Sequence, residues 1–355
     1  MTASRAWLWT TVLLTAAALV SAVLLAPSAG AAPVRGLSWL LFTGSSVHVA
    51  STAWLFTVPA VRAYAAQHLV RCLWVPVSLI VIAGAVAAAT SPAIFQWLLL
   101  PYFGWQFYHY QKQNIGMASL AASAQRAGAL LPAERWPLLL AGWAGIAALV
   151  ARPGLLGLRV QPLGQFPLAH GVFLLSAATY ATAVTAGVAA VARRPRALRP
   201  AGFCSIYLTC LLFCLPAFIF ASPYAAVGGM TIAHGAQYLL LVTLIAGGSA
   251  APGAVRVSRP VRLALLANIA FIGGAALSAA SHLHNAGQLG RLAFGAYLGI
   301  VMSHFVIDAG LWRMRDPLAR RFLTRHLPYL VPGRPNPDEW RETRVLRRPI
   351  DRQPI

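Results

Sequence analysis

Apolar runs of about 20 residues recur along most of this chain, separated by short polar stretches. Twenty residues of α-helix span about 30 Å, which matches the hydrocarbon layer of a membrane. Within that layer every backbone N–H and C=O group needs an internal partner, so we expect each run to be helical. The sequence predicts ten membrane-spanning helices, at residues 6–26, 37–58, 69–89, 93–115, 136–152, 167–192, 201–222, 224–248, 261–280 and 291–312.

Composition supports the same fold class. Of the 355 residues, 59% are hydrophobic and only 10% are charged, whereas a soluble domain has about a quarter charged residues. We therefore predict an all-α, polytopic transmembrane bundle over residues 1–312. Residues 313–355 are rich in Arg and Pro and predict a basic, partly disordered tail. Segment 116–130 either continues the fourth helix or lies at the membrane interface.

The basic residues predict an orientation. Lys and Arg total 28 against seven Asp and Glu, for a net charge of +21, and basic residues collect in cytoplasmic loops. With the N-terminus inside, the inner loops hold twelve basic residues and the outer loops hold four. We predict a multi-pass protein of the plasma membrane with both termini in the cytoplasm. The predicted partner is the lipid bilayer with its anionic headgroups, and not nucleic acid, because no nucleic-acid motif is present.

The first apolar run has a second interpretation. A short positive region ending at Arg5 precedes it, and small residues follow at 28–32. That arrangement is typical of a cleaved signal peptide. The run is long for a signal sequence, which favours a retained helix. Cleavage would leave nine helices with unchanged orientation.

Four predicted helices carry a histidine within the apolar layer, where ionisable groups are costly and commonly mark functional sites. Polar residues follow one turn later on the same helix face. The pairs are His48 with Thr52, His109 with Gln113, His234 with Gln237 and Tyr238, and His304 with Asp308. Asp308 is the only carboxylate within a predicted span.

All four of these helices run in the same direction across the membrane. At about 1.5 Å per residue, His48 and His234 lie roughly 15–17 Å from the outer boundary, and His109 and His304 about 20–24 Å from it. This placement predicts either one elongated site or two pairs at different depths.

Imidazole is the commonest metal ligand in proteins. We predict that His48, His109, His234 and His304 bind a metal, and we assign catalytic roles to Asp308 and Gln113. Three or four His with one carboxylate suit mononuclear iron, copper or zinc, and two facing His suit a haem. The predicted cofactor is iron, copper or haem, with zinc as the alternative. A carboxylate-bridged di-iron site is disfavoured, because the spans supply one carboxylate.

These residues predict a metal- or haem-dependent oxidoreductase that acts on an apolar small molecule or passes electrons. The alternatives are a proton-coupled transporter with a His/Asp relay, a zinc-dependent membrane lipid hydrolase, and a structural subunit without chemistry. The chain has no His-Glu-x-x-His motif and no His-x-x-His-His box, which disfavours zinc proteases and membrane desaturases. In residue type alone the histidines resemble those of bacterial membrane carotene-cleaving oxygenases, and His with Asp resembles the alkaline ceramidase-type hydrolases. No local motif matches either, so no family is assigned.

Other metal-binding residue types lie elsewhere in the chain. His170, His282 and His284 fall near the predicted outer face, where they are either exposed residues without a role or a second metal or haem-edge site. The cysteines lie in apolar segments and are expected to be free thiols.

Overall fold

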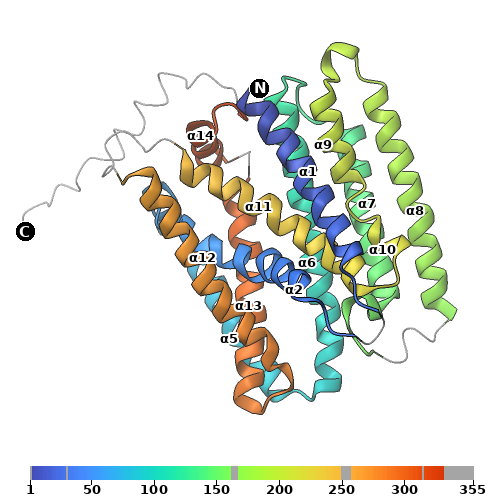
Figure 1. Ribbon diagram of the computed structural model, residues 1–355, viewed down its shortest axis with the longest axis vertical. Helices are drawn as coiled ribbons and strands as arrows, with labels where there is room; N and C mark the ends of the chain where they lie inside the picture. Colours follow the sequence, from blue (N-terminus) through green and yellow to red (C-terminus); the bar gives the residue numbers. More distant parts are fainter. Residues whose placement is uncertain (1, 29–30, 161–166, 249–256, 314–315, 332–355) are drawn as a thin grey trace, which may run out of the picture.

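The computed structural model describes residues 2–28, 31–160, 167–248, 257–313 and 316–331. Over these residues the protein is built from helices and has no strand, which confirms the all-α prediction. The helices pack side by side into one bundle, with the N-terminus at its upper end in Figure 1.

The bundle contains fourteen α-helices in the described part of the chain. They are α1 (Ala3–Leu24), α2 (Arg35–Phe42), α3 (His48–Leu55), α4 (Pro59–Gln67), α5 (Val75–Ala89), α6 (Pro92–Ala124), α7 (Pro132–Ala151), α8 (Pro167–Ala192), α9 (Ala201–Leu211), α10 (Pro216–Ile219), α11 (Gly229–Gly247), α12 (Arg259–Ser281), α13 (Gln288–Leu311) and α14 (Pro317–His326). Three π-helical segments, η1 (Thr43–Val47), η2 (Val70–Trp74) and η6 (Tyr224–Gly228), lead directly into α3, α5 and α11.

All ten predicted spans coincide with helix, but ten crossings are not confirmed. Six helical segments are long and apolar enough to cross a membrane, at Ala3–Leu24, Val70–Ala89, Pro167–Ala192, Tyr224–Gly247, Arg259–Asn285 and Gln288–Leu311. The others are shorter, interrupted or more polar. Helix α6 continues to Ala124, so most of segment 116–130 prolongs the fourth helix. The predicted tail contains α14, and residues 332–355 lie outside the described residues.

Small residues on α13 let α5 approach it closely. Gly295 and Gly299 are spaced one turn apart on α13 and face α5. A Cβ atom on Gly295 would lie 2.6 Å from Ala87 Cβ, and one on Gly299 would lie 2.7 Å from Leu79 O. Side chains larger than hydrogen do not fit at such distances, so the glycines allow the backbone contact that is common between membrane helices.

A second close approach joins η1 to α11. A Cβ atom on Gly44 would lie 2.6 Å from Ile232 Cα, and one on Gly235 would lie 2.7 Å from Gly44 Cα. The two backbones therefore touch, with glycine on both sides. Because His48 follows η1 directly and His234 precedes Gly235, this contact brings the two histidines together. π-Helical turns occur often at functional sites.

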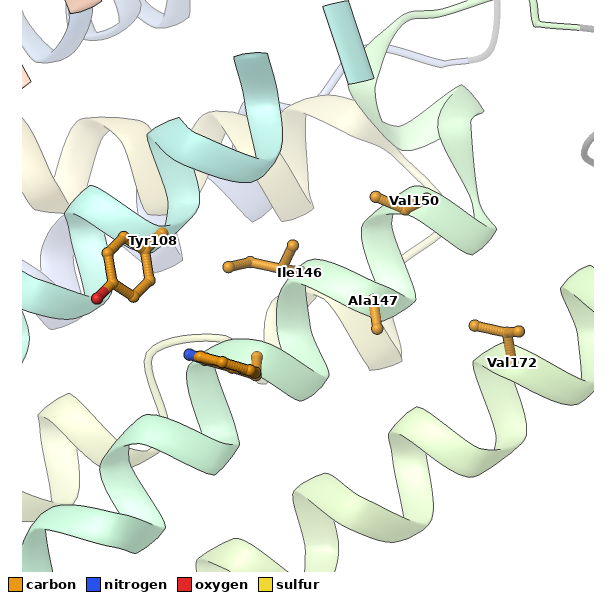
Figure 2. A pocket seen from close by; sticks show the side chains of 6 residues that line it. Tyr108, Ile146, Ala147, Val150 and Val172 are labelled. Atoms are coloured by element: carbon orange, nitrogen blue, oxygen red, sulfur yellow. The ribbon is translucent and has the colours of Figure 1, made fainter. Parts of the chain in front are cut away.

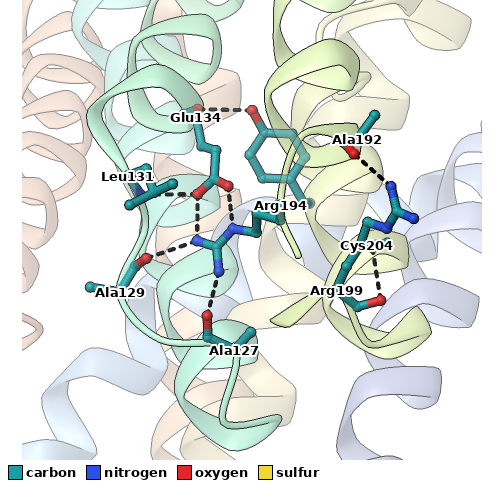
Figure 3. Close-up of polar contacts among 9 residues, drawn as sticks. Ala127, Ala129, Leu131, Glu134, Ala192, Arg194, Arg199 and Cys204 are labelled. Carbon is teal, nitrogen blue, oxygen red and sulfur yellow. Dashed lines mark hydrogen bonds and ion pairs between the residues drawn. The ribbon is translucent and has the colours of Figure 1, made fainter. Parts of the chain in front are cut away.

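A buried ion pair joins the first turn of α7 to the chain that follows α8 (Figure 3). The Arg194 guanidinium donates to both carboxylate oxygens of Glu134 and to the carbonyl oxygens of Ala127 and Ala129. The Tyr207 hydroxyl donates to Glu134 O at 2.8 Å. The hydrogen bond with Glu134 raises the pKa of Arg194 above its ordinary value. These contacts hold the α6–α7 loop against the chain that follows α8.

Candidate metal centre

The four predicted histidines meet in a single cluster within the bundle. The ring centroids lie 5.0 Å apart for His48 and His234, 5.1 Å for His234 and His109, 5.0 Å for His109 and His304, and 5.1 Å for His304 and His48. Each ring therefore has two imidazole neighbours at nearly equal distance, and the four close into a ring. All four side chains are buried. The histidines do not form two separate pairs at different depths.

Ligand atoms of the cluster form two groups of three, which share His304. One nitrogen each from His48, His234 and His304 lie within 4.8 Å of one another, and the same limit holds for His109, His304 and a carboxylate oxygen of Asp308. Metal–imidazole bonds are about 2.0–2.1 Å long, which puts neighbouring ring centres around one ion roughly 4.5–5.2 Å apart. The distances between neighbouring rings, 5.0–5.1 Å, fall within that range.

The cluster nitrogens have few hydrogen-bond partners among the described residues. The unpartnered atoms are His48 Nδ1 and Nε2, His109 Nε2, His234 Nδ1 and Nε2, and His304 Nε2. An unsatisfied buried polar atom typically costs about 1–3 kcal/mol. A metal ion would satisfy one nitrogen of each ring that binds it. The donor set therefore fits a metal on chemical grounds.

Different contacts orient the individual rings. The Tyr110 ring stacks on His234, with centroids 3.9 Å apart and planes at 21°, and Phe305 stacks on His109 at 4.5 Å and 25°. The pairing of histidine with a polar residue one turn later does not predict either stacked ring. Tyr110 and Phe305 each follow a cluster histidine by one position, but each stacks on a histidine of another helix, which the sequence does not indicate.

His304 is held by hydrogen bonds instead. Its Nδ1 lies 2.7 Å from Thr52 Oγ1, which lies 2.8 Å from Tyr238 Oη. The Tyr238 hydroxyl donates to Asp308 Oδ1 at 3.1 Å. Asp308 Oδ2 also lies 3.7 Å from His304 Nε2. Trp312, one turn after Asp308, packs edge-on against Tyr238 with centroids 6.3 Å apart. Asp308, assigned from sequence, therefore lies beside the cluster.

Gln113 lies one turn beyond His109, but its amide is directed to α11. Its Nε2 donates to His234 O at 3.1 Å and to Gln237 Oε1 at 3.0 Å. Gln237 in turn donates to Thr15 Oγ1 at 2.9 Å. This amide chain links α6, α11 and α1 and does not contact the imidazole rings through any hydrogen bond of Gln113.

A cavity of about 340 Å³ reaches the cluster, and His48 forms part of its wall. Most of its lining comes from α6 and α13 and is aromatic or aliphatic: Leu99, Tyr102, Phe103 and Tyr110 from α6, and Phe294, Tyr297, Leu298, Val301 and Phe305 from α13. Besides His48, its polar lining residues are Ser45, Gln106, Thr231 and Ser281. From Leu99 to Tyr110 the helix advances roughly 16 Å. No Lys, Arg, Asp or Glu lines the cavity. It is an elongated, uncharged chamber that ends at the histidines.

A second hollow lies apart from the cluster, between α6, α7 and α8 (Figure 2). It measures about 290 Å³ and is lined by Tyr108, Trp143, Ile146, Ala147, Val150 and Val172. Trp143 is 63% exposed. The lining contains no metal-binding side chain, so the hollow fits contact with lipid tails.

The remaining metal-binding residue types do not gather into a site within the described residues. His282 and His284 are exposed at the end of α12, where His282 Nδ1 lies 2.7 Å from Ser278 O, and His170 is exposed on α8. The four cysteines, Cys72, Cys204, Cys210 and Cys214, are free.

Comparison with known proteins adds no assignment, because no family model, curated protein or solved structure matches the chain. The chemistry of the cluster and its cavity is therefore the basis for a functional assignment.

Proposed function

We propose that the protein is a membrane oxidoreductase in which His48, His109, His234 and His304 hold one redox-active iron or copper ion. Its substrate is an apolar small molecule that dissolves in the bilayer. The observation that carries the proposal is a closed ring of four imidazoles with unpartnered nitrogens at the end of an aromatic cavity. An ion held by four imidazoles supplies electron-transfer and dioxygen chemistry.

The spacing of the rings favours a single ion over haem. A haem between two axial histidines needs a wide, flat space on all sides of the iron. Here every imidazole has two further imidazoles about 5 Å away, and these occupy the space that the macrocycle would need. Imidazole ligands suit iron, copper and zinc alike. The choice between redox and hydrolytic chemistry therefore depends on the residues that line the cavity.

The cavity favours redox chemistry over hydrolysis. A zinc hydrolase has to admit water and position an acid or base beside the bond that it cleaves. The chamber lining lacks charged groups and is mostly apolar. A pure electron carrier would not need such a chamber, and a transporter would need access from both sides. An uncharged, apolar substrate fits this lining best.

The protein's own residues have separable roles in this proposal. Tyr102, Phe103 and Tyr297 bind the apolar substrate and keep water out. Asp308 supplies the negative charge that partly balances the ion, from a position 3.7 Å from His304. Tyr110 and Phe305 hold two of the ligand rings in place by stacking.

We extend the proposal to topology: ten crossings of the plasma membrane, with both termini in the cytoplasm. Support comes from the excess of basic residues in alternate loops and from helix at every predicted span. The cluster then lies within the bilayer, where a substrate can reach it from lipid.

Metal analysis of the purified full-length protein tests the function. We expect about one iron or copper per chain, an absorption or paramagnetic resonance signal from the ion, and loss of both in His109→Ala and His234→Ala. The matched control is His170→Ala, which removes an exposed histidine of α8 and should leave the metal content unchanged. Stoichiometric zinc would replace the redox assignment by the hydrolase. Protein that stays metal-free after incubation with iron and copper salts would overturn the proposal.

A further inference from the structure

One of the four cluster histidines differs from the others in its surroundings. Both ring nitrogens of His48 and of His234 lack a hydrogen-bond partner among the described residues, and so does Nε2 of His109. His304 Nδ1 instead lies 2.7 Å from Thr52 Oγ1 on another helix. A metal-binding histidine usually donates its second N–H to a fixed acceptor, which sets its tautomer and orientation.

His304, Thr52, Tyr238 and Asp308 form a chain of hydrogen bonds, and the number of hydroxyl protons sets which atom donates at each step. With Asp308 ionised as the counter-charge of the proposed ion, the Tyr238 hydroxyl donates its one proton to Asp308 Oδ1, so Tyr238 Oη accepts from Thr52. Thr52 also has one hydroxyl proton, which this bond uses. Thr52 Oγ1 can therefore only accept from His304, and the proton of the His304 ring is on Nδ1. This assignment follows from the acceptor at the end of the chain.

A proton on Nδ1 of His304 leaves Nε2 of the same ring unprotonated. With the proton on Nδ1, His304 Nε2 carries a free lone pair, and it is this atom that is buried without a hydrogen bond. Thr52 comes from α3, Tyr238 from α11 and Asp308 from α13. Three helices therefore fix one imidazole, whereas the neighbouring rings are held by stacking and packing.

We propose that Thr52 and Tyr238 are positioning residues, which hold His304 with its proton on Nδ1 and its Nε2 directed at the ion. His304 is then the anchor ligand of the cluster. The inference rests on the proposed function, because it needs a metal at the four histidines. It adds to the proposed function a defined role for two uncharged side chains, Thr52 and Tyr238, that are not ligands.

Copper(II) binding to the full-length, metal-stripped protein tests the inference. Thr52→Val removes the acceptor for His304, and we expect copper affinity to fall about 10–100-fold, the usual loss for such a partner. Tyr238→Phe frees the Thr52 hydroxyl to donate to His304 Nδ1, so a similar fall is expected. Thr52→Ser keeps the hydroxyl and should bind within a few-fold of the native protein.

A matched control and a spectroscopic readout separate positioning from a general effect on folding. Thr15→Val removes a buried threonine hydroxyl that accepts from Gln237, away from the imidazoles, and should leave copper affinity unchanged. Spin-echo modulation from the remote nitrogen of a copper-bound imidazole reports its N–H hydrogen bond. We expect one such signal to change in Thr52→Val and to return in Thr52→Ser.

The outcomes for the two proposals are distinct. If the native protein binds no copper, iron or zinc, the proposed function fails. If the native protein binds copper while Thr52→Val and Tyr238→Phe keep its affinity and remote-nitrogen signals, only the positioning role is overturned. Equal losses in Thr15→Val and Thr52→Val would also contradict it, because the loss would then follow any missing buried hydroxyl.

Discussion

Each cluster histidine has a polar residue one turn later on its helix, but these four polar residues make two different kinds of contact. Thr52, Tyr238 and Asp308 meet one another across three helices. Gln113 turns to the backbone of α11. The sequence predicts which helix face carries each residue. It cannot predict the pairing of Thr52 with Tyr238, 186 residues apart, because the rotation of each helix about its axis is set by packing.

Gln113 permits a direct test of its catalytic assignment. Its amide donates to two oxygens, His234 O and Gln237 Oε1, and in Gln113→Met both would lose this donor. We expect the free energy of unfolding to fall by roughly 1–3 kcal/mol, while the metal content stays at one ion per chain. Thermal unfolding in detergent together with metal analysis measures both. If Gln113→Met keeps its stability but loses the proposed oxidoreductase activity, the catalytic role predicted from sequence is supported instead.

At the scale of elements, the apolar runs predict where the helices lie, but they do not predict where the helices are irregular. Helix α6 extends over 33 residues although Gln106, Lys112 and Asn114 interrupt its apolar pattern. The π-helical turns before α3 and α11 were not foreseen, because a π turn leaves no periodic signal in sequence. Their consequence is nevertheless local to the site, since η1 ends at Val47, directly before His48.

The contact between η1 and α11 predicts the effect of one added methyl group. In Gly235→Ala the new Cβ would lie 2.7 Å from Gly44 Cα, so the two backbones have to separate and His48 moves away from His234. We expect loss of at least half of the bound metal and a lower unfolding temperature.

Gly116→Ala is the matched control, because a Cβ atom there meets nothing within 4 Å and alanine favours helix over glycine by up to about 1 kcal/mol. It should bind metal normally and be as stable as the native protein or more so. Normal metal binding in Gly235→Ala would mean that the η1–α11 contact does not set the position of the histidines.

At the scale of the whole molecule, the polar groups divide between two regions. The imidazole cluster lies within the bundle, and the buried Arg194–Glu134 pair joins the start of α7 to the chain after α8. The charge distribution in the sequence predicts that the two ends of the bundle differ. It does not predict that the first part of the tail is folded, yet Leu323 on α14 and Leu327 and Leu330 directly after it are buried.

The docking of α14 should depend on pH through His326. Burial lowers the pKa of His326 below its ordinary value of 6.5, Arg325 and Arg262 lower it further, and the Phe322 carbonyl opposes them. Docked α14 therefore favours neutral His326, whereas undocked α14 takes up a proton at the ordinary pKa. The contribution to docking is complete above about pH 6.5 and is lost as the pH falls toward the lowered pKa.

Hydrogen exchange of residues 317–331 in detergent, at pH 7.5 and pH 5.5, measures this effect after correction for the intrinsic exchange rate. We expect lower protection at pH 5.5 in the native protein and a much smaller difference in His326→Gln, which has no proton to take up. His284→Gln alters an exposed histidine at the end of α12 and should keep the native dependence. If His326→Gln loses protection at pH 5.5 as the native protein does, another group controls docking. If only His326→Gln is insensitive, one half-buried imidazole couples the folded tail to pH without any contribution from the imidazole cluster.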